Sequence, residues 1–172
     1  MTEPIGFATL KRSFPPIADA RARVLVLGTL PGEASLRRGE YYAHPRNLFW
    51  PIVFALFGAK PATDYAERLA FVAARRIALW DVCEFAEREA SADTAIRAER
   101  PNAIDRLLDA HPLIRAIAFN GTGARRLYDR HFARRAELAY LALPSTSPAH
   151  ARMDFAAKLA RWTALREVLS GL

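Results

Sequence analysis

Four short runs of apolar residues recur along the 172-residue chain, and stretches with a helical pattern separate them. Each run is brief and is bounded by loop-forming residues, which is typical of a strand buried on both faces. Parallel pairing is favoured because parallel neighbours need crossover connections, and helices supply them here. We therefore predict an α/β fold, a three-layer α/β/α sandwich around a central, mainly parallel four-stranded sheet. The predicted strands are Val24–Leu27, Ile77–Trp80, Ala116–Phe119 and Leu138–Leu143.

Five helical patterns lie between and after these strands. In each, apolar side chains recur three or four positions apart and mark one buried face. A length of 172 residues, 52% of them hydrophobic, suits one domain with a sizeable core, so we expect residues 1–172 to form a single unit. The helices are predicted after Asn47 (Trp50, Val53, Phe54 and Phe57 inward), after a cap at Thr63 (Leu69 and Val72 inward), after Pro101, after Gly121, and from about Arg152 (Phe155, Leu159, Trp162, Leu165 and Leu169 inward).

Polar, loop-like residues follow each predicted strand. In open α/β sheets, ligands bind beyond the carboxyl ends of the strands, where such loops meet. We therefore expect the loops to converge on one crevice. They are Gly28–Asn47, Asp81–Asp93, Asn120–Gly121 and Pro144–Arg152.

The motifs of several other enzyme classes are absent. The segment GTLPG is not a dinucleotide-binding GxGxxG turn, and the chain has neither a P-loop nor a GxSxG nucleophile elbow. Without an elbow, a catalytic triad built from Ser145, His150 and Asp81 is disfavoured. The histidines are scattered singly and Cys83 is the lone cysteine, so we predict no disulfide, no metal site, no iron–sulfur cluster and no cofactor.

The charge balance favours a polyanionic partner. The formal net charge is +7, and arginines are spread from Arg12 to Arg166 rather than gathered in a tail. Only three of the 25 basic residues are lysines, which also fits a coding bias. No stretch approaches the ~20 apolar residues of a membrane span, and the first residues lack a signal-peptide core. We expect a cytoplasmic protein that acts as a monomer and does not bind membranes.

Several longer motifs carry a resemblance to a known family. In this order and spacing they resemble the uracil-DNA glycosylase superfamily, and the first is similar to the pattern of its deoxyinosine (hypoxanthine) DNA glycosylase branch. The resemblance implies a base-excision repair enzyme that needs no cofactor, flips a deaminated base (hypoxanthine, also uracil) out of DNA and hydrolyses its N-glycosidic bond. The motifs are GTLPGEASLRRGEYYAHPRNLFW (Gly28–Trp50), LWDVCEFAER (Leu79–Arg88), the stretch Ser91–Ile96, FNGTGA (Phe119–Ala124) and LPSTSPAHA (Leu143–Ala151).

The resemblance also suggests catalytic residues. The superfamily usually holds the attacking water with an Asp or Asn at the third residue of the first motif, but that residue here is Leu30, which can only line the base site. In the hypoxanthine branch the asparagine of HPRN takes this role, so Asn47 is our candidate; capping the following helix is its alternative role. Asp81 is a candidate for orienting water or reading the base. Its alternative roles are a helix cap or a partner for an arginine.

Four residues are candidates for holding the base. Tyr42 matches an aromatic that stacks on the base in the mismatch-specific uracil/thymine glycosylases, or else it is an ordinary half-buried aromatic. His44 and His150 are candidates for stabilising the departing base, since imidazolium donates hydrogen bonds from both nitrogens. His44 alternatively fastens its own loop. Asn120 either binds the base or closes the following turn, and we favour the turn.

Phosphate contacts and a wedge are expected around the crevice. Short hydroxyls and arginines suit phosphate oxygens. The intercalating loop of the family matches Ala149–Arg152. This stretch has no large apolar side chain, so we expect His150 or Arg152 to act as the wedge. The candidate DNA-binding residues are Ser145, Thr146, Ser147, Arg37, Arg38, Arg46 and Arg152.

Two other functions remain open at this point. A non-catalytic DNA- or nucleotide-binding protein on the glycosylase scaffold is favoured by Leu30 and by the missing wedge. A small hydrolase acting on nucleosides or esters ranks third, because arginine-rich loops suit a polyanion better than a nucleoside. The lysines Lys11, Lys60 and Lys158 lie outside the motifs, which disfavours a glycosylase with a lysine nucleophile.

Overall fold

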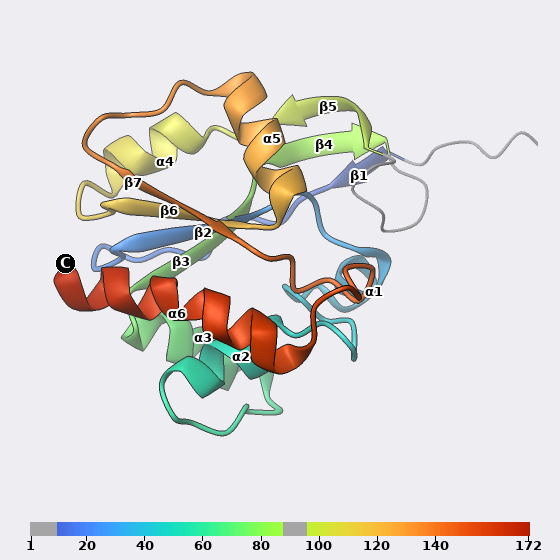
Figure 1. The fold of residues 1–172 in the computed structure, drawn as a ribbon. Helices are drawn as coiled ribbons and strands as arrows, with labels where there is room; N and C mark the ends of the chain where they lie inside the picture. The colour runs from blue at the N-terminus through green and yellow to red at the C-terminus, as the bar shows by residue number, and fades with distance from the viewer. Residues whose placement is uncertain (1–9, 88–95) are drawn as a thin grey trace, which may run out of the picture.

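The computed structural model describes residues 10–87 and 96–172 and has a parallel sheet at its centre (Figure 1). The sheet has four strands in the order β3-β2-β6-β7. These are β2 (Val24–Gly28), β3 (Ile77–Asp81), β6 (Ala116–Asn120) and β7 (Ala139–Leu143), each within a residue of a predicted strand. The predicted α/β class with a four-stranded parallel sheet is confirmed.

The four strands end level with one another. Gly28 pairs with Asp81 across β2 and β3, and Asn120 pairs with Leu143 across β6 and β7. Because all four run in the same direction, their carboxyl ends share one edge of the sheet. The segments that leave the strands begin side by side there, and this arrangement positions the site.

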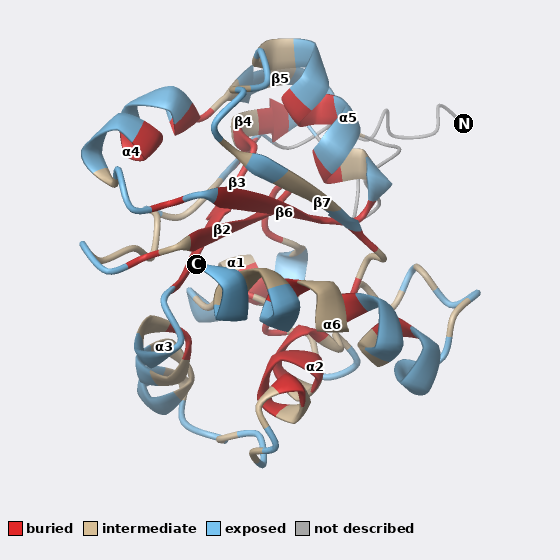
Figure 2. Cartoon of the chain, turned by 60° about the vertical axis from the view of Figure 1, so that its left-hand side comes forward, coloured by how far each residue is buried: buried red, intermediate tan, exposed pale blue. Residues whose placement is uncertain are grey.

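Helices cover both faces of the sheet and complete the three layers (Figure 1). One face carries α2 (Phe49–Leu56), α3 (Tyr65–Ala74) and α6 (Phe155–Gly171), and the other carries α4 (Ile104–Ala110) and α5 (Thr122–His131). Side chains of β2 alternate between two cores: Val24 and Val26 pack toward α2, α3 and α6, and Leu25 and Leu27 pack toward α4 and α5. Figure 2 shows these strands buried between helices whose outer faces are exposed.

A second, antiparallel sheet has no counterpart in the sequence prediction. It has the order β1-β4-β5, with β1 at Leu10–Arg12, β4 at Cys83–Glu87 and β5 at Arg97–Pro101. The prediction of a loop at Asp81–Asp93 is therefore wrong over residues 83–87. These strands are short and charged, so they lack the apolar run that marks a core strand. Residues 88–95, with most of the Ser91–Ile96 motif, lie outside the described residues.

Two early helices also differ from the prediction. The predicted loop Gly28–Asn47 contains α1 (Glu33–Arg38), whose six residues are too few for a helical pattern to show. The cap of α3 is Asp64 rather than Thr63, because the Asp64 carboxylate accepts a hydrogen bond from the Glu67 N–H at 3.2 Å. None of the helices in the described ranges is both long enough and apolar enough to cross a bilayer.

The last helix, α6, begins at Phe155 rather than near Arg152. Asp154 caps it, since its carboxylate accepts a hydrogen bond from the Ala157 N–H at 2.8 Å. Phe155 is 38% exposed instead of facing inward as predicted, whereas Lys158 is only 2% exposed. The buried face of α6 thus includes a lysine that a hydrophobic pattern assigns to solvent.

Candidate active site

The segments that follow the four parallel strands converge on one pocket at the carboxyl edge of the sheet, as predicted. The pocket measures about 120 Å³, on a scale where one water molecule needs roughly 10–15 Å³. It therefore has room for a planar ring system. The candidate residues that line it are Leu30, Tyr42, His44, Asn47, Asp81, Asn120, Ser145, Thr146 and Ser147.

Asp81 ends β3 and places its carboxylate over the end of β2. The residue is 4% exposed, and a Cβ added to Gly28 would lie 2.6 Å from Asp81 Oδ1 and 3.4 Å from the Tyr42 hydroxyl. The carboxylate occupies this position only because residue 28 has no side chain. Since β4 rather than a helix follows Asp81, the helix-cap alternative is wrong. Burial, together with the nearby charge of Asp81, raises the pKa of Tyr41 far above its usual value, so this hydroxyl keeps its proton.

The backbone at Asp81 is held by a residue that the sequence analysis missed. Asn102 is 6% exposed, and its Nδ2 donates hydrogen bonds to the backbone oxygens of Asp81 at 2.8 Å and Cys83 at 3.1 Å. Asn102 follows β5 in a stretch without any recognisable motif, so no sequence signal pointed to it. It ties the turn between β3 and β4 to the start of α4.

Tyr42 and Tyr41 are adjacent but differ in role. The Tyr42 ring lines the pocket and stacks on Phe49, with ring centroids 3.9 Å apart and an angle of 22° between the planes. Its backbone is in the left-handed region at φ 56°, which is unusual for a residue other than glycine and concentrates at functional sites. Tyr41 also borders the pocket, but it is 3% exposed and its hydroxyl donates to the Pro15 carbonyl at 3.2 Å, so its ring belongs to the core.

Asn47 precedes α2, and the two polar atoms of its side chain have different surroundings. Its Oδ1 accepts a hydrogen bond from the Phe49 N–H at 2.9 Å, so the predicted contact with the start of the helix is present. The N–H can only donate, so the atom it meets must be the amide oxygen. Within the described residues, Nδ2 of Asn47 donates no hydrogen bond, and the residue lines the pocket. Helix stabilisation and ligand binding can therefore coexist in this one side chain.

His44 both fastens its loop and faces the pocket. Its Nδ1 accepts a hydrogen bond from the Arg46 N–H at 3.1 Å, and its backbone carbonyl accepts one from the Asn47 N–H at 2.9 Å. With Nδ1 as an acceptor, the ring carries its proton on Nε2 and has one donor rather than the two of an imidazolium. The two roles considered for His44 are thus compatible.

Asn120 serves the fold. Its Nδ2 donates to Thr146 Oγ1 and its Oδ1 accepts from the Thr146 N–H, both at 2.9 Å. This reciprocal pair ties the end of β6 to the segment after β7, and the Leu48 N–H donates to the Thr146 carbonyl at 3.0 Å. Thr146 is completely buried, so its side chain cannot reach a phosphate and its assignment as a DNA contact is wrong.

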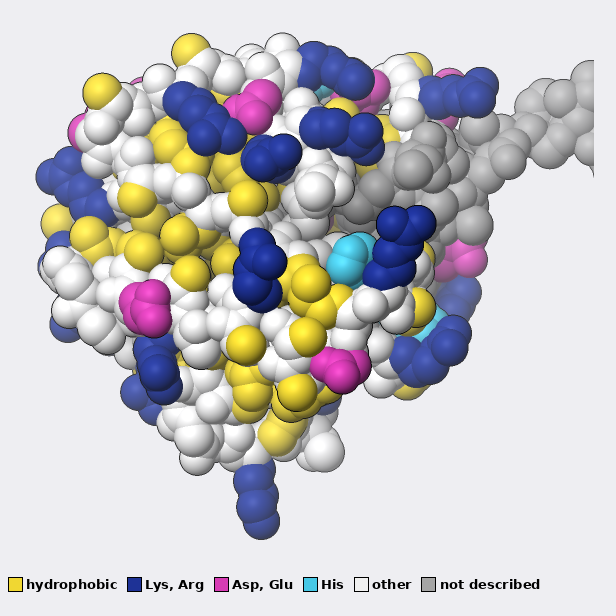
Figure 3. All heavy atoms as spheres, viewed as in Figure 1, with side chains coloured by type: hydrophobic (Ala, Val, Ile, Leu, Met, Phe, Trp, Pro, Cys, Tyr) yellow, Lys and Arg dark blue, Asp and Glu magenta, His cyan; other side chains and the backbone are white. Residues whose placement is uncertain are grey.

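The remaining candidates lie outside the pocket lining. Arg37, Arg38, Arg46 and Arg152 are exposed, and none forms an ion pair with any of the described residues. His150 is half-buried with an Nδ1 that has no hydrogen-bond partner there, and it does not line the pocket either. In Figure 3, histidine and basic side chains lie together over α1 and the segment before α6, and further basic side chains are spread over the rest of this face. These residues surround the pocket rather than form it.

The pocket also contains residues of the first motif that the sequence analysis did not single out. Ser35 in α1 is 6% exposed and accepts a hydrogen bond from the Ala43 N–H at 3.1 Å, while Glu33 pairs with Lys11 at 3.5 Å. Both line the pocket because α1 follows the end of β2 directly. In the described ranges, no group of three or more His, Cys, Asp or Glu side chains is placed to hold a metal ion.

Comparisons with known proteins agree with this geometry. The sequence is 38% identical over 112 residues, which is 64% of this chain and 71% of the relative, to a hypoxanthine DNA glycosylase from Methanosarcina barkeri. It is 37% identical over 116 residues, 67% of this chain and 73% of the relative, to a hypoxanthine DNA glycosylase from Methanosarcina acetivorans.

A solved structure has the same fold over nearly the whole chain. It is the solution NMR structure of a protein from Methanosarcina acetivorans that is provisionally described as a uracil DNA glycosylase. The TM-score is 0.82 at 33% identity, and the match covers 94% of this chain and 99% of the other. The sequence profile of the uracil DNA glycosylase superfamily matches residues 15–166. The chain therefore belongs to the uracil DNA glycosylase superfamily.

Proposed function

We propose that this protein is a DNA glycosylase that hydrolyses the N-glycosidic bond of hypoxanthine in DNA. The observation that carries the proposal is the pocket at the carboxyl edge of the sheet, which combines an aromatic platform, an amide and a buried carboxylate. Relatives at 37–38% identity that are named hypoxanthine DNA glycosylases support the choice of base. Uracil is the second substrate that we expect.

Base capture depends on Tyr42 and Leu30. A base inside a duplex is out of reach, so it must rotate out of the stack, which costs least for a mispaired base such as hypoxanthine. Tyr42 is fixed against Phe49 and gives the flipped base a rigid surface on which to stack. Leu30 is 5% exposed and adds an apolar wall that excludes bulk water.

Water activation is assigned to Asn47 and Asp81. The Asn47 Nδ2 donates to the water oxygen, while Asp81 accepts a proton from the water as its oxygen bonds to C1′ of the sugar. The N-glycosidic bond breaks, and the bonding pair leaves with the base. Asn47 thereby supplies the water contact that the usual position, Leu30, cannot provide.

The departing base carries negative charge and needs a hydrogen-bond donor. His44 supplies one, because the Nδ1 contact with the Arg46 N–H leaves the proton on Nε2. No lysine of the described residues lines the pocket, which supports direct hydrolysis over a Schiff-base intermediate. We therefore propose a monofunctional enzyme, and we keep the separate expectation that it acts as a monomer.

Phosphate contacts are assigned to the rim of the pocket. Ser145 and Ser147 offer hydroxyls from the segment after β7, and Arg37, Arg38, Arg46 and Arg152 add positive charge that no acidic side chain of the described residues neutralises. Arg152 and His150 remain our candidates for the wedge.

The test is base release from labelled duplexes that contain a single inosine, uracil or thymine mismatch, with cleavage of the abasic product read on a gel. We expect release of hypoxanthine first and uracil second. Salt-dependent DNA binding without release from any duplex would contradict the proposal and favour a non-catalytic binding protein, for which Leu30 is the best argument. Release from free deoxyinosine but not from duplex DNA would favour a nucleoside hydrolase.

A further inference from the structure

The segment after β7, Pro144–His150, is held at both ends by donors on one face of α6. Lys158 Nζ donates to the His150 carbonyl at 2.7 Å, and Trp162 Nε1 donates to the Pro144 carbonyl at 2.9 Å. The two donors are four residues apart, so they lie one above the other on the helix. We call Pro144–His150 the clamped segment.

The middle of the clamped segment is fixed as well. Thr146 is bound on both sides, by Asn120 through the reciprocal pair and by the Leu48 N–H at 3.0 Å. Ser145 and Ser147 lie between these fixed points and line the pocket. The segment is therefore held at several points. Its two serine hydroxyls also accept hydrogen bonds from its own backbone, Ser145 Oγ from the Ser147 N–H and Ser147 Oγ from the Ala149 N–H, both at 3.2 Å.

Lys158 is an unusual choice for one of these contacts. It is 2% exposed, and within the described residues its ammonium has the His150 carbonyl as its hydrogen-bond acceptor and no carboxylate partner. Burying a charge without a counter-charge is costly, and burial accordingly lowers the pKa of Lys158. An apolar residue here would pack at lower cost, so stability does not explain the lysine.

We propose that Lys158 is a positioning residue that holds the clamped segment in its DNA-binding shape and meets its counter-charge when a DNA phosphate docks on that segment. This inference rests on the proposed function. The neighbouring serines supply hydroxyls suited to phosphate oxygens, and the buried ammonium is bonded to His150 at the end of the same short segment. Lys158 then acts on DNA affinity and not on the chemical step.

The experiment compares Lys158→Met with Lys60→Met. Both remove one lysine charge, but Lys60 is exposed and lies in none of the contacts described. Dissociation constants are measured by fluorescence anisotropy on a duplex with a stable abasic-site analogue, across a series of salt concentrations. Single-turnover base release at saturating enzyme measures the chemical step separately.

We expect Lys158→Met to weaken binding by about tenfold or more and to flatten the dependence of affinity on salt. Its saturated single-turnover rate should stay within about threefold of the unmodified protein, and Lys60→Met should behave as the unmodified protein in every measurement. Unchanged affinity, or a lower saturated rate at unchanged affinity, would overturn the inference. If the methionine variant does not fold, Lys158→Gln carries the same comparison, with weaker binding expected and unchanged binding overturning it.

The two proposals fail separately. If the unmodified protein releases no base, the proposed function is wrong, but the affinity series still tests Lys158. If base release proceeds and Lys158→Met binds DNA normally, only the inference on Lys158 is wrong.

Discussion

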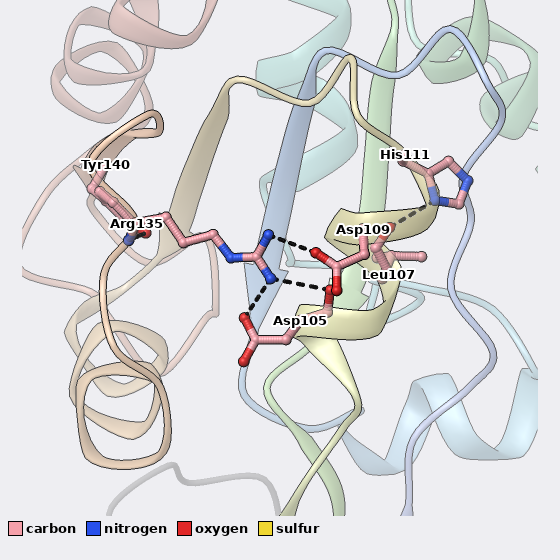
Figure 4. A network of polar contacts seen from close by, with 6 residues as sticks. All are labelled: Asp105, Leu107, Asp109, His111, Arg135 and Tyr140. Atoms are coloured by element: carbon pink, nitrogen blue, oxygen red, sulfur yellow. Dashed lines mark hydrogen bonds and ion pairs between the residues drawn. The ribbon is translucent and has the colours of Figure 1, made fainter.

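The basic side chains of two regions differ in whether carboxylates neutralise their charge. Arg135, between α5 and β7, contacts Asp109 at 2.8 Å and Asp105 at 2.9 Å, and Figure 4 shows its guanidinium bonded to both residues of α4. Around the pocket, Arg46, Arg152 and the buried Lys158 have no carboxylate partner among the described residues. Carboxylates of α4 thus neutralise Arg135, whereas no carboxylate of the described residues neutralises these basic side chains near the pocket, where a polyanion is expected to bind.

The largest effect is expected at the pocket. Asn47→Ala should lower single-turnover base release by about a thousandfold, since a positioned hydrogen bond in the reaction is lost. Asn47→Asp is the partner variant, because it keeps an acceptor for the Phe49 N–H while it replaces the amide donor by a charged carboxylate oxygen. We expect the aspartate variant to fold normally and to release base more slowly than the unmodified protein. Normal base release by the alanine variant would show that the amide serves the helix alone.

A smaller loss is expected from Gly28→Ala, which tests the position of Asp81. The added methyl would meet Asp81 Oδ1 at 2.6 Å, so the carboxylate must shift. We expect base release to fall by about a hundredfold in a single-turnover assay, in line with the loss of general-base function. Gly171→Ala is the control, since nothing lies within 4 Å of a Cβ there. A normal rate for Gly28→Ala would argue that Asp81 is not needed.

The rim arginines should affect binding and not chemistry. Arg46→Ala combined with Arg152→Ala is expected to raise the dissociation constant for duplex DNA by about tenfold or more. The salt slope should also fall by about one for each phosphate that the variant no longer binds. Titrations at several salt concentrations measure both quantities. Arg135→Ala is the control for one removed charge, because carboxylates already neutralise that side chain. Equal effects of the two changes would break the comparison between the two regions.

The smallest effect is expected at Arg135. Arg135→Ala should lower the free energy of unfolding by about 1 kcal/mol, as is typical of ion pairs near the surface. The side chains of Asp105 and Asp109 are 56% and 71% exposed, so solvent weakens both contacts. Thermal unfolding measures the loss, and base release should be unchanged. A fall in base release at unchanged stability would mean that Arg135 contributes to the function.

The parallel sheet and the position of the pocket followed from the sequence for one physical reason. A strand buried on both faces must be apolar throughout, and β2 and β6 show that pattern without interruption. Polar residues at the ends of such strands then had to meet at one edge. The antiparallel strand β5, RAERP, has no such pattern because most of its side chains face solvent, and it escaped prediction.

The site was predictable only where residue type and chain position agree. Asp81, Asn47 and Tyr42 belong to motifs and line the pocket. The sequence does not show, however, that the side chain of Asn120 is hydrogen-bonded to Thr146. Lys158 could not be identified, because a hydrophobic pattern assigns every lysine to solvent. Such contacts depend on three-dimensional packing between segments far apart in the chain.

The stacking of Tyr42 on Phe49 connects the pocket to two tryptophans. Phe49 lies edge-on to Trp162, with ring centroids 5.9 Å apart, and edge-on to Trp50 at 5.0 Å. Two of the three tryptophans of the chain therefore sit one ring away from the surface on which the flipped base is expected to rest. We therefore expect base capture to change the intrinsic tryptophan fluorescence, which would follow the step in real time without any label on the protein or the DNA.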